Sequence, residues 1–181
     1  MSSNDFQQKY AFFFRRVDIQ QLYPPFRTLV ESLFLNCLSR GAPYYATSAY
    51  RSSEEQDDLY TLGRTVKNNN ANIKTPMGTI VTNAKGGESA HNFGLAVDFA
   101  LDGDKNKEGL QPDWSSSAYK ILGEEAGKLG LEWGGNWKNF KDSPHVQLKL
   151  SKNNINLKDL NKILKQKGMA EVYKFLDLYK W

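Results

Sequence analysis

The chain has 181 residues, of which 40% are hydrophobic, 24% are charged and 13% are aromatic. This length and composition predict one globular domain with a buried core and exclude a disordered chain. No apolar run has the length of a membrane helix, so we expect no membrane insertion. The aromatic run at 11–14 follows a polar start and precedes Arg15 and Arg16, so we expect no signal peptide and folding in the cytoplasm.

The net charge of +4 lies in the last part of the chain, because residues 151–181 contain seven lysines and three acidic residues. A basic tail suits an anionic surface such as nucleic acid, lipid or an acidic cell-wall polymer, although a solvated helix face also explains scattered lysines. The single cysteine, Cys37, excludes an internal disulfide and lies in an apolar helical pattern, which predicts a buried thiol.

The first half of the chain predicts a helix, a strand and a second helix. Apolar residues at helical spacing occupy residues 23–41, with prolines at the start and a glycine at the end. Residues 44–50 favour a strand, and a capping box at Ser52 or Ser53 opens a helix to about Leu62. Arg51 therefore falls at a strand-to-helix joint, where side chains are commonly displayed for function.

The second half predicts further strands and helices after a long loop. Residues 64–90 are rich in turn formers and predict a lid or binding loop. Strands are expected at 94–101 and 145–150, with a helix at 115–128 between them. This mixture predicts an α+β domain built on a small antiparallel sheet with packed helices.

Residues 151–181 contain two short helical patterns separated by Gly168. About thirty residues have too little core to fold alone. We therefore expect a domain over 1–150 and a basic helical hairpin over 151–181 that packs on the same domain.

The two histidines each have an aspartate nearby in sequence. In one straight strand the odd separation of His91 and Asp98 points them to opposite faces, and in a helix they lie about 10.5 Å apart. A turn at Asn92 and Gly94 can bring them together. Pro144 favours an extended approach to His145, which opens a strand, with Asp142 just before it.

These residues suit a catalytic zinc site, which takes three protein ligands and leaves one position for water. His91, Asp98 and His145 are the candidate ligands, and Asp142 is the candidate proton acceptor. Taken singly, a histidine on a half-buried strand is more often structural. Both histidines having a carboxylate at a usable offset and a place at a strand boundary favours the metal site.

At these residues the chain resembles the zinc peptidases that cut peptidoglycan stem peptides. This family includes D-alanyl-D-alanine carboxypeptidases and dipeptidases and the L-alanyl-D-glutamate endopeptidases of phage endolysins. Residues 89–98, SAHNFGLAVD, match its Ser-x-His-x-x-Gly-x-Ala-x-Asp signature, and residues 141–148, KDSPHVQL, resemble its second segment. Residues 47–65 resemble the upstream segment, and the similarity extends over about 18–180.

The resemblance implies the fold of this peptidase family, Zn²⁺ as cofactor and a role for each site residue. His91, Asp98 and His145 are implied as metal ligands, Asp142 as the catalytic acid and base, and Arg51 as the residue that contacts substrate or stabilises the oxyanion. Ser89 is a candidate for substrate binding or for turn capping. Trp133 and Trp137 are candidates for the cleft wall or for core packing, and Trp137 is the one we assign to substrate binding.

With aspartate rather than glutamate at position 142, the chain resembles the endolysin-like branch of the family. This resemblance implies hydrolysis of the L-alanyl-D-glutamate bond and lysis of the bacterial cell wall. Phage endolysins of this type often stay in the host cytoplasm until released, and we expect the same here. We also expect a monomer that binds the stem peptide and neither binds nucleic acid nor inserts into membranes. The alternatives are a D-alanyl-D-alanine carboxypeptidase, a non-catalytic zinc-containing cell-wall-binding module and, from the tail lysines alone, a nucleic-acid-binding protein.

Residues 102–108 have oxygen ligands at alternate positions, namely Asp102, Asp104 and Asn106, as calcium loops do. The segment lacks the glycine and the final glutamate of such loops, which favours an ordinary charged turn. Ca²⁺ is therefore only a second candidate cofactor.

Overall fold

The predicted order of helix, strand and helix is present in the computed structural model, which describes residues 2–68, 71–74, 80–103 and 111–181. Helix α3 spans Pro24–Ser39, strand β1 spans Tyr44–Ser48 and helix α4 spans Ser53–Thr61. The predicted capping box is confirmed, because the Ser52 hydroxyl accepts from the backbone N–H of Glu55 and the Glu55 carboxylate accepts from that of Ser52. It fixes the start of α4 directly after Arg51.

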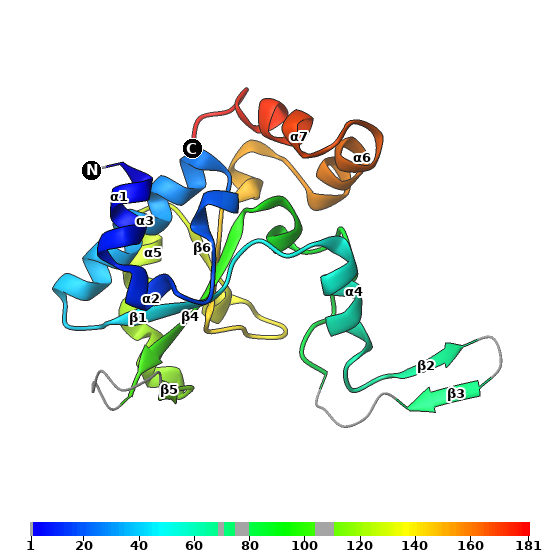
Figure 1. Cartoon of the computed structure of the whole chain (residues 1–181), viewed down its shortest axis with the longest axis horizontal. Helices are drawn as coiled ribbons and strands as arrows, with labels where there is room; N and C mark the ends of the chain where they lie inside the picture. Colours follow the sequence, from blue (N-terminus) through cyan, green and yellow to red (C-terminus); the bar gives the residue numbers. More distant parts are fainter. Residues whose placement is uncertain (1, 69–70, 75–79, 104–110) are drawn as a thin grey trace.

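The main sheet is antiparallel throughout, as the sequence predicts, with the strand order β1-β4-β7-β6 and with β5 paired to β4. Its remaining strands are β4 (Ala96–Asp102), β5 (Pro112–Asp113), β6 (Glu132–Trp133) and β7 (His145–Gln147). Figure 1 shows β4 running through the centre of the molecule. The central position of β4 matters because it carries Asp98.

Helices α3 and α5 (Lys120–Lys128) contact one another, and their apolar faces join the buried core. Cys37 is fully buried there, as predicted, and burial raises the pKa of its thiol to about 12. The start of the chain, which has no predicted element, forms two short helices, α1 (Ser3–Lys9) and α2 (Ala11–Phe14). They fold because Phe6 and Phe14 pack against Phe34 of α3 with ring centroids 5.8 and 5.1 Å away.

The two helical patterns of the tail form α6 (Leu157–Lys167) and α7 (Met169–Leu176). Leu160, Val172 and Leu176 are fully buried in the same core as the sheet. The Tyr23 hydroxyl donates to the Asp177 carboxylate at 2.7 Å, which ties the end of α7 to the start of α3. The division of the chain into a domain over 1–150 and an extension over 151–181 stays a prediction.

Three predicted boundaries are wrong. The interval 64–90 is not all loop, because β2 (Thr65–Asn68) and β3 (Ala71–Lys74) pair as an antiparallel hairpin. Figure 1 shows this hairpin projecting beyond α4. The strand expected at 145–150 ends at Gln147, and a 3-10 turn follows at Leu150–Asn153. The strand expected at 44–50 ends at Ser48, after an irregularity in its pairing with β4.

Short 3-10 turns complete the fold. They are η1 (Ile19–Gln21), η2 (Ala90–Phe93), η3 (Ser116–Tyr119), η4 (Gly134–Asn136) and η5 (Leu150–Asn153). The helix expected at 115–128 thus begins as η3 and continues as α5.

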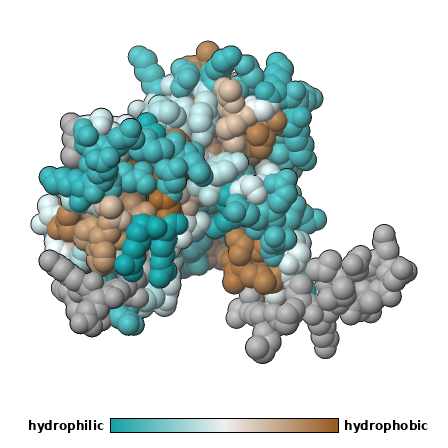
Figure 2. All heavy atoms as spheres, in the orientation of Figure 1, coloured by the Kyte–Doolittle hydropathy of each residue, from teal (hydrophilic) through white to brown (hydrophobic). Residues whose placement is uncertain are grey.

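Across the described residues, every helix is too short or too polar to cross a membrane. The face shown in Figure 2 is mostly hydrophilic over α6 and α7.

Candidate metal centre

The register of the sheet places Asp98 beside His145. Asp98 of β4 pairs with His145 of β7 on one side and with Ser48 of β1 on the other. Directly paired residues in an antiparallel sheet point to the same face with their Cβ atoms about 4.5–5.5 Å apart. The three side chains therefore form one row across the sheet.

His91 reaches the same place from the turn η2, which precedes β4. The Ser89 hydroxyl caps this turn by accepting from the backbone N–H of His91 at 3.4 Å. Gly94 ends it with φ +65°, a left-handed conformation that favours glycine. The predicted reversal between His91 and Asp98 is thus confirmed, and it returns the chain into β4.

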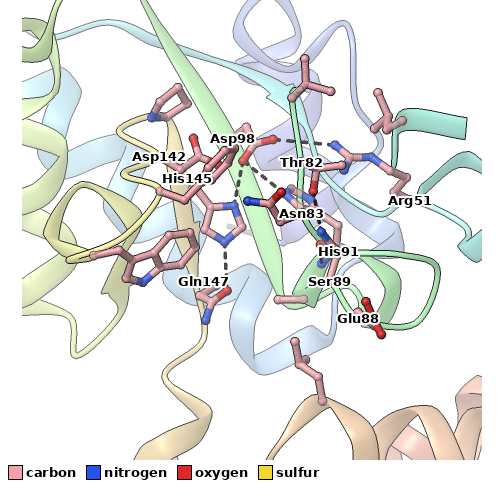
Figure 3. A pocket seen from close by; sticks show the side chains of 18 of the residues that line it. Arg51, Thr82, Asn83, Glu88, Ser89, His91, Asp98, Asp142, His145 and Gln147 are labelled. Atoms are coloured by element: carbon pink, nitrogen blue, oxygen red, sulfur yellow. Dashed lines mark hydrogen bonds and ion pairs between the residues drawn. The ribbon is translucent and has the colours of Figure 1, made fainter. Parts of the chain in front are cut away.

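The two imidazoles point nitrogen atoms at one carboxylate oxygen, as Figure 3 shows. Asp98 Oδ1 lies 3.2 Å from His91 Nε2 and 3.0 Å from His145 Nδ1. One ligand atom from each of the three residues lies within 4.8 Å of the others. The spatial convergence on which the predicted zinc site depends is therefore present.

The other nitrogen of each ring has an acceptor of its own. His91 Nδ1 lies 2.5 Å from the carbonyl oxygen of Ala49, and His145 Nε2 lies 2.9 Å from Gln147 Oε1. A neutral imidazole that donates to such an acceptor keeps its lone pair on the opposite nitrogen. In that tautomer both lone pairs face the carboxylate oxygen and can coordinate a cation, whereas a protonated ring donates to Asp98 instead.

The donor set fits zinc, which binds histidine nitrogen and carboxylate oxygen at about 2.0–2.2 Å in tetrahedral geometry. Ligand atoms of such a tetrahedron lie about 3.4 Å apart, and the separations of 3.0 and 3.2 Å to Asp98 are close to this. His91, Asp98 and His145 thus form a possible metal site with three ligands.

Asp98 and His145 shift one another's pKa. Burial alone would raise the pKa of Asp98, but the neighbouring imidazoles of His91 and His145 hold it well below its usual range. Burial would lower the pKa of His145, but the hydrogen bond and negative charge of Asp98 raise it above the ordinary value. The carboxylate therefore stays ionised, as a metal ligand must be.

The cluster lies in a cleft of about 580 Å³, whose wall includes Arg51, Ser89, Trp137 and Asp142. The structure thus brings together the three candidate ligands with Asp142, Arg51, Ser89 and Trp137. The loop 81–84, which was predicted only as part of a lid or binding loop, also lines the cleft.

Asp142 precedes β7 and is held by backbone contacts with η4. Its N–H donates to the Gly134 carbonyl at 3.2 Å, and its own carbonyl accepts from the His145 N–H at 3.2 Å. Within the described residues its carboxylate has no hydrogen-bond partner. Burial, and then the charge of Asp98, raise the pKa of Asp142 above the usual value. A partly buried carboxylate without a partner is available to exchange a proton.

Arg51 is held by a buried amide. Its Nη1 donates to Gln56 Oε1 at 2.8 Å and its Nη2 to Ser48 Oγ at 2.7 Å, while Nη2 lies 3.8 Å from Asp98 Oδ2. Gln56 is fully buried and donates in turn to the Ala84 carbonyl at 2.8 Å. The guanidinium is thereby held beside the cluster of His91, Asp98 and His145.

The candidates at the cleft wall divide into two groups. The ring of Trp137 lies 5.1 Å from that of His145 and lines the cleft, with its indole N–H donating to Glu132 at 2.7 Å. Trp133 instead packs against the core and donates to the Ser143 carbonyl at 2.7 Å. Ser89 both caps η2 and lines the cleft, so capping is confirmed and substrate binding stays a prediction.

Of the three calcium candidates, Asp102 lies among the described residues. Asp102 is buried and accepts from the Tyr45 hydroxyl at 3.3 Å and from the Gln111 N–H at 3.1 Å. These contacts give it a structural use in the turn. Asp104 and Asn106 lie outside the described residues, and a calcium site stays a prediction.

Sequence reasoning missed the residues that support the site, namely Ala49, Gln56, Asn92 and Gln147. The Asn92 side chain is buried, donates to the carbonyls of Arg51 and Ser52 at 3.0 and 3.1 Å, and accepts from the Gly87 N–H at 2.9 Å. It was predicted only as a turn former. Gln147 lies two residues after His145, on the same face of a strand, and this spacing is the one signal that could have identified it.

Three candidate ligands come from two strands and a turn, beside a carboxylate without a hydrogen-bond partner among the described residues and an arginine held in place. This arrangement is typical of metal-dependent hydrolases. Residues 82–148, which contain all three ligands, match the sequence profile of a peptidase family described as D-alanyl-D-alanine carboxypeptidase. The chain is also 41% identical over 138 residues to the peptidoglycan L-alanyl-D-glutamate endopeptidase CwlK of Bacillus subtilis (strain 168), over 70% of this chain and 73% of that protein. The chain belongs to this family of peptidases, M15.

Two further similarities are more limited. An L-alanyl-D-glutamate peptidase of Listeria phage A118 is 39% identical over 62 residues, which is 33% of this chain and 20% of that protein. The crystal structure of the Serratia marcescens L-Ala D-Glu endopeptidase ChiX matches with a TM-score of 0.49 at 21% identity, over 76% of this chain and 87% of that one.

Proposed function

We propose that the protein is a zinc-dependent endopeptidase that hydrolyses the L-alanyl-D-glutamate bond of peptidoglycan stem peptides and so lyses the bacterial cell wall. The observation that carries this proposal is the convergence of two imidazole nitrogens and a carboxylate oxygen in one cleft, which Asp142 and Arg51 also line. The names of the relatives in Bacillus subtilis and Listeria phage A118 support this choice of bond.

His91, Asp98 and His145 would hold the zinc ion. When bound, zinc would act as a Lewis acid toward the amide carbonyl and a water molecule. The outer contacts of the two rings, to the Ala49 carbonyl and the Gln147 amide, set which nitrogen of each imidazole faces the ion. These contacts favour neutral imidazoles, so that Asp98 supplies the negative charge among the three ligands.

Asp142 would take the proton of the attacking water and then give it to the leaving amine. The base must first be ionised and the acid must then be protonated, so a carboxyl whose pKa is raised toward the working pH suits both steps. Burial is the main cause of the raised pKa of Asp142. A module that only bound cell wall would not need such a carboxyl beside the metal ligands.

Arg51 would stabilise the oxygen that becomes negative as the carbonyl is attacked. Its side chain already has two hydrogen bonds, to Gln56 and Ser48, and a guanidinium has five N–H donors. The remaining donors are available to the substrate, and their positions are fixed before it binds. Fixed donors stabilise a developing charge better than donors that must reorganise.

The test is mass spectrometry of purified peptidoglycan digested by the protein, with and without a chelator. New L-alanine carboxyl ends paired with D-glutamate amino ends, lost on chelation, are expected. Release of free D-alanine would assign the carboxypeptidase activity instead, the activity in the family's description. Peptidoglycan that binds the protein but is not cut would indicate the non-catalytic cell-wall-binding module instead.

A further inference from the structure

A second groove, of about 880 Å³, adjoins the catalytic cleft. It lies between α6 and the chain at Gly87–Glu88, and we call it the α6 groove. Glu88 and Leu157 line both the α6 groove and the catalytic cleft, so the two hollows adjoin one another. A ligand too long for the cleft can therefore extend into the groove.

The α6 groove is basic. Lys158, Lys162 and Lys165 line it, at helical spacings of four and three that place them on one side of α6. All three are exposed, and no carboxylate of the described residues lies within ion-pair distance of any of them. The acidic Glu88 also lines the groove, and its carboxylate accepts from the Lys85 N–H at 3.0 Å. The lysines therefore outnumber the acidic residue and are free to bind an anion.

The wall opposite α6 is part of the chain that positions the metal ligands. Gly87 has φ +80°, and a side-chain carbon there would overlap the amide of Asn161 on α6. The Gly87 N–H donates to Asn92, the neighbour of the ligand His91. The α6 groove is thus held at a fixed position relative to the metal centre.

We propose that the α6 groove binds the carboxylate-bearing part of the peptide substrate on the D-glutamate side of the bond that is cut. This proposal rests on the proposed function. A D-glutamyl residue whose amine forms the scissile amide keeps one carboxyl group outside the peptide bonds, and the residues that follow add further carboxyl groups. These carboxylates complement the three lysines. From Leu157 to Lys165 the helix rises about 12 Å, a length covered by three to four residues of extended peptide.

The test compares two peptides and two variants of the full-length, zinc-loaded protein. One peptide contains L-Ala-D-Glu followed by residues with free carboxylates, and in the other peptide these carboxylates are amides. The groove variant is K158Q/K162Q/K165Q. The matched control is K149Q/K152Q/K180Q, which removes the same charge from exposed lysines outside the groove.

Calorimetry and steady-state kinetics should give the same pattern. The groove variant should bind the free-acid peptide about tenfold more weakly and raise its KM by a similar factor with kcat unchanged, while the amide peptide and the control variant are unaffected. Salt should weaken binding of the free-acid peptide to the wild type but not to the groove variant. Equal losses in both variants, or for both peptides, would overturn the proposal.

Two other outcomes separate the possible errors. If the groove variant loses affinity only for a purified phosphate-rich wall polymer, the peptide is the wrong occupant and the proposal is overturned. If the wild type binds the free-acid peptide through the three lysines but leaves its L-alanyl-D-glutamate bond intact, the proposed function fails while the α6 groove stands.

Discussion

Replacement of Gly134 by alanine should disable the site without touching a ligand. Gly134 is buried in η4, and a Cβ there would overlap the Asp142 carbonyl and lie 3.2 Å from the Cβ atoms of both Asp142 and His145. The carbonyl would have to retreat by about 1 Å to reach an ordinary contact distance. This movement pulls on the backbone bonds that join Asp142 to Gly134 and to His145.

Two effects follow, with different magnitudes. Overpacking of a filled site costs about 1–3 kcal/mol of unfolding free energy. Displacement of a catalytic group by about 1 Å costs about 100-fold in rate. We therefore expect G134A to fold with reduced stability and to lose about 100-fold in kcat.

The matched control is Gly127→Ala. Gly127 is exposed in α5 and has no atom within 4 Å of the position of a Cβ. Alanine there should stabilise the protein by about 0.5–1 kcal/mol, because glycine is a poor helix former. Urea unfolding and hydrolysis of a soluble L-Ala-D-Glu peptide measure both variants. A G134A protein with wild-type kcat would refute the reasoning.

Three further variants test separate parts of the account. Asp142→Asn should keep its zinc, measured by elemental analysis, and lose peptide hydrolysis by at least about 100-fold, because the amide cannot accept the proton. Gln56→Ala should lower kcat/KM by about 10- to 100-fold with zinc content unchanged, because Arg51 loses its buried anchor, and should cost about 1–3 kcal/mol of stability. Glu125→Gln should destabilise the fold at pH 7, since the hydrogen bond from Lys128 holds the pKa of Glu125 below its ordinary value.

The sign of the last effect follows from proton linkage. A carboxyl whose pKa is lower in the folded than in the unfolded protein adds stability above its unfolded pKa, and this stability is lost as the pH falls through the folded pKa. The gap in urea midpoint between the wild type and E125Q should therefore be widest near neutral pH and close in acid. A gap that grows on acidification would contradict this assignment. If Asp142→Asn or Gln56→Ala hydrolysed the peptide at the wild-type rate, that residue would have no part in the mechanism.

The convergence of the three candidate ligands could be predicted from the sequence because each constraint on it is local. The odd spacing of His91 and Asp98 excludes a single regular element and requires a turn, and Gly94 supplies one. Pro144 directs the approach to His145 in the same way. The place of Asp142 just before His145 made it a candidate proton acceptor, the family resemblance added Arg51, and the structure places both in the same cleft.

The supporting residues could not be predicted because their partners are distant in sequence. Gln56 acts through Arg51 and the loop at Ala84, and the Ala49 carbonyl meets His91 only once β1 lies beside β4. Burial of these groups depends on the sheet register, which no local pattern fixes. The α1 and α2 helices were missed for the same reason, since segments this short depend on packing against α3 rather than on their own propensity.

The central claim is that His91, Asp98 and His145 hold one metal ion, and X-ray absorption of the zinc-loaded protein tests it most directly. We expect one zinc per chain, two imidazole nitrogens and a carboxylate oxygen at about 2.0–2.2 Å, and loss of that zinc in His145→Ala. A sulfur ligand, or one tightly bound zinc that persists unchanged in His145→Ala, would contradict it.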